Sequence, residues 1–252
     1  MGRGLVETRS RARAIIMAGQ VRVNGAVTDR AGSVVRPGDS VDLVAPPRFV
    51  GRGGDKLAHA LDAFALDVRG RVAADVGAST GGFTDCLLEA GATRVYAIDV
   101  GYGQLAERLR LDKRVVVMDR TNVRGVATLP EPVECVTVDV SFISLRLVLP
   151  VVRGWLGNGG ACVPLIKPQF EAGRGSVGKG GVVRDPAIHR RVLSEVLGAS
   201  EAAGLGVRGL VRSPLLGPAG NVEFLAHLVV GAESIDWPAA VGTLVESSET
   251  PR

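Results

Sequence analysis

Residues 71–90 have the sequence RVAADVGASTGGFTDCLLEA, and this segment sets the fold class of the protein. RVAAD is a short apolar run typical of a buried strand, and the residues from Phe83 to Ala90 are typical of a helix. The glycines between them allow a sharp turn, because glycine adopts backbone conformations that other residues avoid. A strand, a glycine-rich turn and a helix in this order predict the ligand-binding unit of an α/β domain.

Further strands and helices alternate on both sides of this unit. Helices are expected at residues 56–65, 145–155 and 186–203, and strands at residues 94–99, 114–118, 133–139, 161–166, 207–212 and 222–229. Such alternation predicts a mostly parallel sheet covered by helices on both faces. The expected fold class is therefore α/β and Rossmann-like, and such sheets bind ligands at the carboxyl ends of their strands.

The N-terminal segment has a different pattern and carries the positive charge. Residues 1–52 contain nine Arg and four acidic residues, for a net charge of +5, whereas the rest of the chain has 21 basic and 22 acidic residues. A helix over residues 8–17 followed by VRVNGAV, whose Asn-Gly favours a hairpin turn, predicts a small α+β module. Its charge favours a phosphate-backbone partner, and a solvated arginine-rich surface is the alternative. The candidate RNA-binding residues are Arg9, Arg11, Arg13, Arg22 and Asn24.

The composition argues against several classes of protein. No apolar run approaches the roughly 20 residues that span a bilayer. The first residues also lack the apolar segment of a secretory signal. The three cysteines lie far apart without a CxxC pair, which is typical of buried thiols in a reducing compartment, and no metal site is expected. We therefore expect a cytoplasmic protein without a membrane segment.

The turn after the first strand is the candidate cofactor site. Its spacing, G-x-x-x-G-G, differs from the G-x-G-x-x-G of dinucleotide enzymes and from the phosphate-binding P-loop. A nucleoside without phosphates, such as S-adenosylmethionine, fits better, and a dinucleotide or a purely structural turn are the alternatives. Asp99, at the end of the next strand, is placed to accept hydrogen bonds from ribose hydroxyls. The candidate cofactor residues are Asp75, Gly77, Ala78, Ser79, Thr80, Gly81, Gly82, Phe83 and Asp99.

Two charged residues stand at neighbouring strand ends. Asp139 ends the strand VECVTVD and Lys167 follows the strand ACVPLI, so a parallel sheet would bring both over one crevice. Methyl transfer from a sulfonium to a ribose hydroxyl needs no metal, but it needs a group that removes or polarises the hydroxyl proton. A lysine amine can do this when its surroundings lower its pKa. Lys56 and Glu223 are further candidates, although each by itself is more typical of an ordinary surface charge.

Nine segments, in this order along the chain, resemble the TlyA-type (haemolysin A) ribosomal RNA 2'-O-methyltransferases. They are RGLVETRSRARAIIMAGQVRVNG, GRGGDKLAHAL, DVGASTGGFTDCLL, AIDVGYGQL, VVVMDRTNVRG, DVSFISL, PLIKPQFE, GGVVRDP and GPAGNVEF. Proteins of this family join an S4-like RNA-binding domain to an FtsJ-like methyltransferase domain. The resemblance extends from the N-terminus to about residue 230.

The resemblance implies an S-adenosylmethionine-dependent enzyme that methylates a ribose 2'-hydroxyl of ribosomal RNA, commonly at a cytidine. The Lys-Asp-Lys-Glu tetrad of the family falls on Lys56, Asp139, Lys167 and Glu223, and its cofactor loop falls on residues 77–82. Asp99 takes the ribose position, and Asp119 is implied near the adenine. Also implied are ribosomal subunits as partners and a sheet with strand order 3-2-1-4-5-7-6, in which strand 7 is antiparallel.

The resemblance also suggests domain boundaries. An S4-like RNA-binding domain is predicted over residues 1–46, a linker over 47–53, an FtsJ-like methyltransferase domain over 54–231 and a polar tail over 232–252. Two features depart from the family pattern. The first helix of S4-like domains, with the form R-x-D-x-x-L-V, is missing before MGRGLVETRS, and Phe49 is the aromatic residue nearest to the usual linker Trp.

Two other functions are alternatives to this hypothesis. A membrane-active haemolysin, as the older family name suggests, would need a long apolar segment or a basic amphipathic helix with aromatic anchors, and the sequence has neither. A non-catalytic RNA-binding or ribosome-assembly factor would use the basic module alone, and pure binding has no use for the Lys, Asp, Lys and Glu set. The leading hypothesis is the S-adenosylmethionine-dependent ribosomal RNA 2'-O-methyltransferase.

Overall fold

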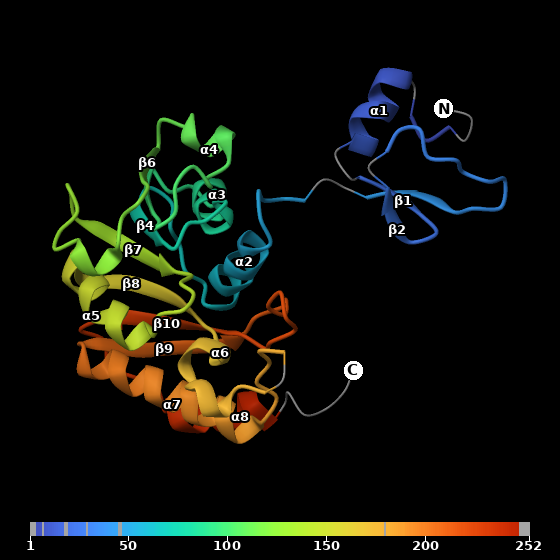
Figure 1. Cartoon of the computed structure of the whole chain (residues 1–252). Coiled ribbons are helices and arrows are strands. Elements are labelled where there is room, and N and C mark those ends of the chain that lie inside the picture. The colour runs from blue at the N-terminus through green and yellow to red at the C-terminus, as the bar shows by residue number, and fades with distance from the viewer. Residues whose placement is uncertain are drawn as a thin grey trace. The chain divides into compact units, whose positions relative to one another are not determined.

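The computed structural model describes residues 4–6, 8–17, 20–28, 30–44, 47–178 and 180–246. The chain divides into two compact units, residues 1–48 and residues 49–252. Each unit is described by itself below, with the element labels of Figure 1.

The first unit pairs one helix with a small antiparallel sheet. Helix α1 (Arg9–Met17) precedes the strands β1 (Val21–Val23), β2 (Ala26–Thr28) and β3 (Val41–Leu43), which lie in the order β2-β1-β3. Thr8 caps the helix, because its Oγ1 accepts a hydrogen bond of 3.2 Å from the backbone N–H of Arg11. Asn24 and Gly25, with φ of 51° and 79°, form the hairpin turn that the Asn-Gly pair predicts.

The second unit contains a seven-stranded sheet with the order β6-β5-β4-β7-β8-β10-β9 (Figure 1). Strand β10 is antiparallel to both of its neighbours, and the other neighbouring strands run parallel. Counted within this unit, the order is the predicted 3-2-1-4-5-7-6, and the predicted fold class is confirmed. The strands are β4 (Val72–Val76), β5 (Arg94–Ile98), β6 (Val115–Met118), β7 (Val133–Val138), β8 (Leu156–Ile166), β9 (Leu205–Arg212) and β10 (Phe224–Val230).

Helices cover both faces of this sheet and give it two apolar cores. Leu57 of α2 and Leu87 of α3 are buried in one core, and Val148 of α5 and Leu193 of α7 are buried in the other. Burial on both faces explains why the parallel strands are nearly continuous apolar runs. The helices are α2 (Gly53–Ala63), α3 (Gly82–Glu89), α4 (Glu107–Arg110), α5 (Leu145–Trp155), α6 (Pro168–Glu171), α7 (Pro186–Ala202) and α8 (Trp237–Glu246), with 3₁₀ turns η1 (Val123–Gly125) and η2 (Arg174–Ser176).

The C-terminal segment corrects one prediction. Residues 232–252 were predicted as a polar tail, but α8 lies within them and packs against α7 and β9. Val241 and Val245, four residues apart, face inward and are fully buried. Trp237 and Leu244 pack against the same core, and together with the two valines they follow the spacing of an amphipathic helix that the prediction of a polar tail overlooked. Among the described helices, none is long and apolar enough to cross a membrane.

Asp75 is a charged residue buried in the centre of the sheet. Its side chain in β4 is 0% exposed, and both carboxylate oxygens accept hydrogen bonds from hydroxyls. Thr84 of α3 donates to Oδ2 at 2.7 Å, and Thr137 of β7 donates to Oδ1 at 3.1 Å. Burial raises the pKa of Asp75 from 3.8 to about 7, against the opposing effect of these hydrogen bonds. Asp75 thus joins three elements below the glycine turn.

We expect the burial of Asp75 to make the stability of the protein depend on pH. The folded-state pKa is raised, so this group favours folding below pH 4 and loses that contribution as pH rises through 7. An Asp75→Asn variant has no such loss. Its free energy of unfolding should therefore rise relative to that of the wild type between pH 5 and pH 7, by at most about 1.4 kcal/mol per pH unit.

Urea unfolding of both proteins at pH 5 and pH 8 measures this difference. Asp62→Asn, on an exposed position of α2, is the matched control and should show the same difference from wild type at both pH values. A difference between Asp75→Asn and wild type that stays constant from pH 5 to pH 8 would contradict the expectation.

Candidate active site

The carboxyl ends of β4 and β7 meet at a close backbone contact. The backbone N–H of Asp139 donates to the carbonyl oxygen of Val76 at 2.8 Å, and Gly77 begins the turn after β4 with a φ of 85°. A Cβ atom at Gly77 would lie 2.4 Å from the backbone oxygen of Asp139. Only glycine fits this position, because both its φ angle and the space around it exclude a side chain.

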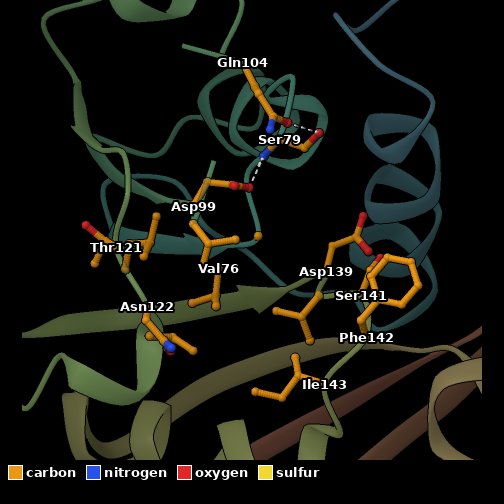
Figure 2. Close-up of a pocket in the computed structure, with 15 residues that line it drawn as sticks. Val76, Ser79, Asp99, Gln104, Thr121, Asn122, Asp139, Ser141, Phe142 and Ile143 are labelled. Atoms are coloured by element: carbon orange, nitrogen blue, oxygen red, sulfur yellow. Dashed lines mark hydrogen bonds between the residues drawn. The ribbon is translucent and has the colours of Figure 1, made fainter. Parts of the chain in front are cut away.

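A pocket of about 520 Å³ opens beside this contact (Figure 2). Its volume lies in the range of small-molecule sites. In Figure 2, Asp99 and Ser79 lie on one side of the pocket and Asp139 with Ser141 on the other. The lining consists of Val76, Gly77, Ser79, Ile98, Asp99, Val100, Gln104, Thr121, Asn122, Val123, Asp139, Val140, Ser141, Phe142 and Ile143.

Asp99 is held in the pocket by the backbone. Its Oδ2 accepts a hydrogen bond of 2.8 Å from the N–H of Ser79, and its Oδ1 accepts one of 2.7 Å from the N–H of Gly101. Each carboxylate oxygen can accept a second hydrogen bond, which suits the two hydroxyls of a ribose. The apolar side chains of Ile98, Val100 and Val123 supply a surface for a purine base. These residues fit the nucleoside part of S-adenosylmethionine.

The glycine turn itself lines a second, smaller cavity of about 120 Å³. This cavity shares Gly77, Ser79 and Asp139 with the larger pocket. The predicted cofactor residues Ala78, Thr80, Gly82 and Phe83 line it, together with Gly51, Arg52 and Gly53 at the beginning of α2. Gly81 is outside both linings; a Cβ atom there would lie 2.3 Å from a methyl carbon of Leu109.

Besides Gly81, two predicted cofactor residues with carboxylate side chains line neither cavity. Asp75 points into the interior, where it meets Thr84 and Thr137. Asp119 forms an ion pair of 2.8 Å with Arg110 and accepts from the backbone N–H of Gly103. Thr121 and Asn122, a few residues later, line the pocket instead. Sequence patterns locate the strand end but not the direction of each side chain beyond it.

Lys167 and Asp139 lie together at the ends of β8 and β7, as their positions in the sequence predict. The Nζ of Lys167 is 2.5 Å from Oδ1 of Asp139, in an ionic contact whose angles lie outside those of a hydrogen bond. Lys167 Nζ also donates a hydrogen bond of 3.2 Å to Ser141 Oγ. Lys167 Nζ therefore lies between a carboxylate and a hydroxyl at the ends of two neighbouring strands.

Lys56 and Glu223 form a second ion pair, although 167 positions separate them in the chain. Lys56 Nζ and Glu223 Oε2 are 2.5 Å apart, and the side chains are only 7% and 1% exposed. Gln169 of α6 donates to the other oxygen of Glu223 at 3.2 Å. The first residue of α2, Gly53, lies beside Asp139: a Cβ atom there would be 3.8 Å from Oδ2 of Asp139. Helices α2 and α6 thus connect the two pairs.

The structure brings in several residues that sequence reasoning missed. Ser141 contacts Lys167, Gln169 contacts Glu223, and Gln104 accepts a hydrogen bond of 3.4 Å from the hydroxyl of Ser79. Ser141 and Gln169 lie within the DVSFISL and PLIKPQFE motifs, so their place next to Asp139 and Lys167 was the available signal. Among the described residues, no cluster of three or more His, Cys, Asp or Glu side chains could hold a metal ion.

The predicted RNA-binding residues belong to the first unit, and they differ in whether their side chains form hydrogen bonds within it. Arg9, Arg11 and Arg13 on α1 and Arg22 on β1 are exposed. Asn24 uses its side chain inside the unit: its Nδ2 donates to Asp39 at 2.8 Å, and its Oδ1 accepts from the backbone of Ser40 at 2.8 Å. Asn24 therefore fixes the hairpin turn against the loop before β3.

Comparisons with known proteins agree with this division of the chain. Residues 49–229 match the FtsJ-like methyltransferase family, and residues 3–41 match the S4 domain family. Bacillus subtilis YqxC, named as an rRNA methyltransferase, is 51% identical over 90% of this chain and 82% of its own. The 16S/23S rRNA (cytidine-2'-O)-methyltransferase TlyA of Mycobacterium tuberculosis is 46% identical over 90% of this chain and 86% of its own.

Solved structures show the same relationship. A Streptococcus thermophilus protein named as a hemolysin has a TM-score of 0.79 and 42% identity, covering 98% of this chain and 92% of that one. The N-methyltransferase NodS of Bradyrhizobium japonicum, solved with S-adenosyl-L-homocysteine, has a TM-score of 0.51 at 17% identity over 70% of this chain and 86% of its own, and so shares the fold. The chain belongs to the TlyA-type (haemolysin A) rRNA methyltransferase family, in which an S4 domain precedes an FtsJ-like methyltransferase domain.

Proposed function

We propose that this protein transfers a methyl group from S-adenosylmethionine to the 2'-hydroxyl of a cytidine ribose in ribosomal RNA. The contact between Lys167 and Asp139, at the edge of a nucleoside-sized pocket, is the observation that carries the proposal. The name of the TlyA relative from Mycobacterium tuberculosis supports cytidine in ribosomal RNA as the target. Because ribosomal subunits are the partners, we place the activity in the cytoplasm.

The larger pocket supplies the groups that would hold the cofactor. Asp99 would accept hydrogen bonds from the ribose hydroxyls, and the turn that begins at Gly77 lines the pocket beside it. Asn122 and Val123 also line the pocket and would contact the base. When bound, S-adenosylmethionine supplies a methyl group on a positively charged sulfur, which makes this carbon reactive without a metal.

Lys167 would handle the proton of the ribose hydroxyl. In its uncharged form the amine accepts the proton that the hydroxyl loses, so that the proton ends on Nζ. Asp139, with Oδ1 2.5 Å from this nitrogen, then stabilises the ammonium that has formed. Ser141 Oγ fixes the direction of the amine from a second side. Reaction geometry of this kind requires groups held within a fraction of an ångström, and two contacts on one nitrogen provide that restraint.

Lys56 and Glu223 would hold the beginning of α2 in place beside the site. Their buried ion pair joins α2 to the segment before β10, and Gln169 joins the same carboxylate to α6. A buried ion pair is costly to break, because the remaining charge has neither water nor a partner. The pair therefore keeps the beginning of α2 close to Asp139.

The substrate proposal also has support outside the pocket. The exposed arginines of the first unit, on α1 and β1, provide positive charge for a phosphate backbone. Phe142, at the pocket, is 90% exposed and has a φ of 63°, which is unusual for a bulky side chain. An exposed aromatic ring at a binding site suits stacking with an unpaired base of RNA.

Replacing Lys167 with alanine should separate catalysis from cofactor binding. Without the amine, the rate of methyl transfer to ribosomal RNA should fall by about 10²–10⁴-fold, which is the usual contribution of a general base. Binding of S-adenosylmethionine, measured by calorimetry, should stay close to that of the wild type. Lys113→Ala, which removes an exposed lysine, is the control and should leave both values unchanged. Full activity in Lys167→Ala would remove this residue from the mechanism.

Replacing Asp99 with alanine should weaken cofactor binding and leave the chemical step largely intact. The variant loses the acceptors for the ribose hydroxyls, so the Kd for S-adenosylmethionine should rise about tenfold or more. Calorimetry measures this change directly, and methyl transfer at saturating cofactor should recover most of the wild-type rate. An unchanged Kd would show that the ribose lies elsewhere.

Mapping ribose methylation across ribosomal RNA tests the function itself. Cells lacking this protein should lose methylation at one or more cytidine 2'-oxygens, and expression of the wild type should restore it. Expression of Lys167→Ala should not restore it, which separates an enzyme from a factor that only binds RNA. Identical methylation maps with and without the protein would refute the proposed function.

A further inference from the structure

Two short segments leave the sheet together and carry the Lys167–Asp139 pair. Residues 139–144 follow β7, and residues 167–171 follow β8. The two segments contact each other at three places. Near the sheet, Lys167 contacts Asp139 and Ser141. Further along, the rings of Phe170 and Phe142 lie 4.7 Å apart, and Glu171 contacts the residues at the start of α5. The contact of Lys167 with Asp139 involves the groups of the proposed reaction, and the contact of Glu171 with the start of α5 lies at the far end of both segments.

The two segments differ in their secondary structure. Residues 167–171 form one helical turn, with Pro168 at its first position and hydrogen bonds from the N–H of Phe170 to the oxygen of Lys167 and from the N–H of Ala172 to the oxygen of Pro168, both 2.9 Å. Residues 139–144, all of them described, contain neither helix nor strand, and Phe142 adopts a positive φ. The position of residues 139–144 therefore depends on what holds their two ends.

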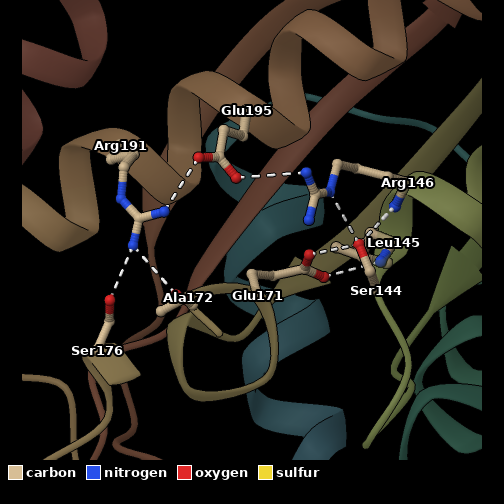
Figure 3. Close-up of polar contacts among 8 residues, drawn as sticks. All are labelled: Ser144, Leu145, Arg146, Glu171, Ala172, Ser176, Arg191 and Glu195. Carbon is tan, nitrogen blue, oxygen red and sulfur yellow. Dashed lines mark hydrogen bonds and ion pairs between the residues drawn. The ribbon is translucent and has the colours of Figure 1, made fainter. Parts of the chain in front are cut away.

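Glu171 holds the far end of residues 139–144 (Figure 3). Its side chain is buried, and its carboxylate accepts two hydrogen bonds from the beginning of α5. Ser144 Oγ donates to Oε2 at 2.7 Å, and the backbone N–H of Leu145 donates to Oε1 at 2.8 Å. Ser144 is the N-cap of α5, and its hydroxyl accepts from the backbone N–H of Arg146 at 3.2 Å. The first turn of α5 has no acidic residue of its own, so Glu171 supplies a second acceptor and the negative charge that a helix N-terminus favours.

A wider set of contacts fixes this arrangement from α7, as Figure 3 also shows. Arg146 donates to the hydroxyl of Ser144 at 3.1 Å and pairs with Glu195 of α7 at 3.4 Å. Arg191 pairs with the same Glu195 at 3.2 Å and donates to the backbone oxygen of Ala172 at 3.1 Å. Both α5 and the residue after Glu171 are thus attached to one helix.

We infer that Glu171 is a positioning residue for methyl transfer: it holds the end of residues 139–144 so that Asp139 stays against Lys167. This inference rests on the proposed function. Glu171 touches neither Asp139 nor Lys167, and it acts through the backbone between Asp139 and Ser144. The carboxylate is the one charged group in contact with the N–H of Leu145 among the described residues.

The test compares Glu171→Ala and Glu171→Gln in the full chain. Glu171→Ala removes both acceptors and should lower kcat for methyl transfer to ribosomal RNA by about 10–100-fold, the scale expected when reacting groups shift by about 1 Å. The Kd for S-adenosylmethionine and the KM for RNA should change by less than about threefold. In Glu171→Gln the amide oxygen still accepts from Leu145, so most of the lost kcat should return.

Amide hydrogen exchange provides a readout that does not require activity. In Glu171→Ala, exchange in a peptide covering residues 139–145 should become faster, while exchange in β4 and β5 should stay as in the wild type. Glu201→Gln, at an exposed position of α7, is the matched control: it leaves Glu171 and its partners in place and should keep kcat within about twofold of the wild type. Ser144→Ala, which removes one partner of Glu171, replaces Glu171→Ala if that variant fails to fold.

Three results would overturn the inference. These are a wild-type kcat in Glu171→Ala, no recovery in Glu171→Gln, or a loss of kcat that is matched by equal losses of cofactor binding and of protection in β4. A wild-type protein that methylates no ribosomal RNA would instead refute the proposed function. Unchanged exchange of residues 139–145 in Glu171→Ala would then still refute the role of Glu171.

Discussion

Parallel pairing of β4 with β7 and of β7 with β8 is the constraint on which the site depends. In this register Val76 lies opposite Val138, and Val138 lies opposite Pro164, so the carboxyl ends of three strands meet at one edge of the sheet. The contact of Gly77 with the backbone of Asp139 leaves no space for a side chain, which ties the cofactor turn to the residue that faces Lys167. Cofactor pocket and charged pair are therefore parts of one backbone arrangement.

Three carboxylates at neighbouring strand ends have three different environments. Asp75 points inward to two hydroxyls, and burial raises its pKa. Asp99 accepts from backbone N–H groups and faces the pocket, and Asp139 lies against the amine of Lys167. The same residue type is thus fully buried, held by backbone N–H groups or paired with an amine, because solvent access and the nearest donor differ at each strand end.

The charged groups of the site hold together elements that are distant in the sequence. The Lys56–Glu223 pair joins α2 to the residue before β10, and Glu171 joins α6 to α5. Neither contact is solvent-exposed, so neither is weakened by screening as a surface pair would be. Buried polar contacts of this kind restrict the backbone to one arrangement, because a displaced partner would leave a charge or an N–H group without compensation.

The sequence by itself determined the alternation of strands and helices, the turn at Gly77, and the meeting of Asp139 with Lys167. These follow from local periodicity and from the rule that parallel strands share one carboxyl edge. Resemblance to a family added the grouping of Lys56 and Glu223 with this pair, and the strand order. Only the tertiary structure decided that Asp75 meets two hydroxyls and Asp119 pairs with Arg110, that α8 packs on α7, and that Glu171 accepts from the N–H of Leu145 at the start of α5. Side-chain direction and contacts across long separations depend on packing between elements, which no local pattern in a single sequence contains.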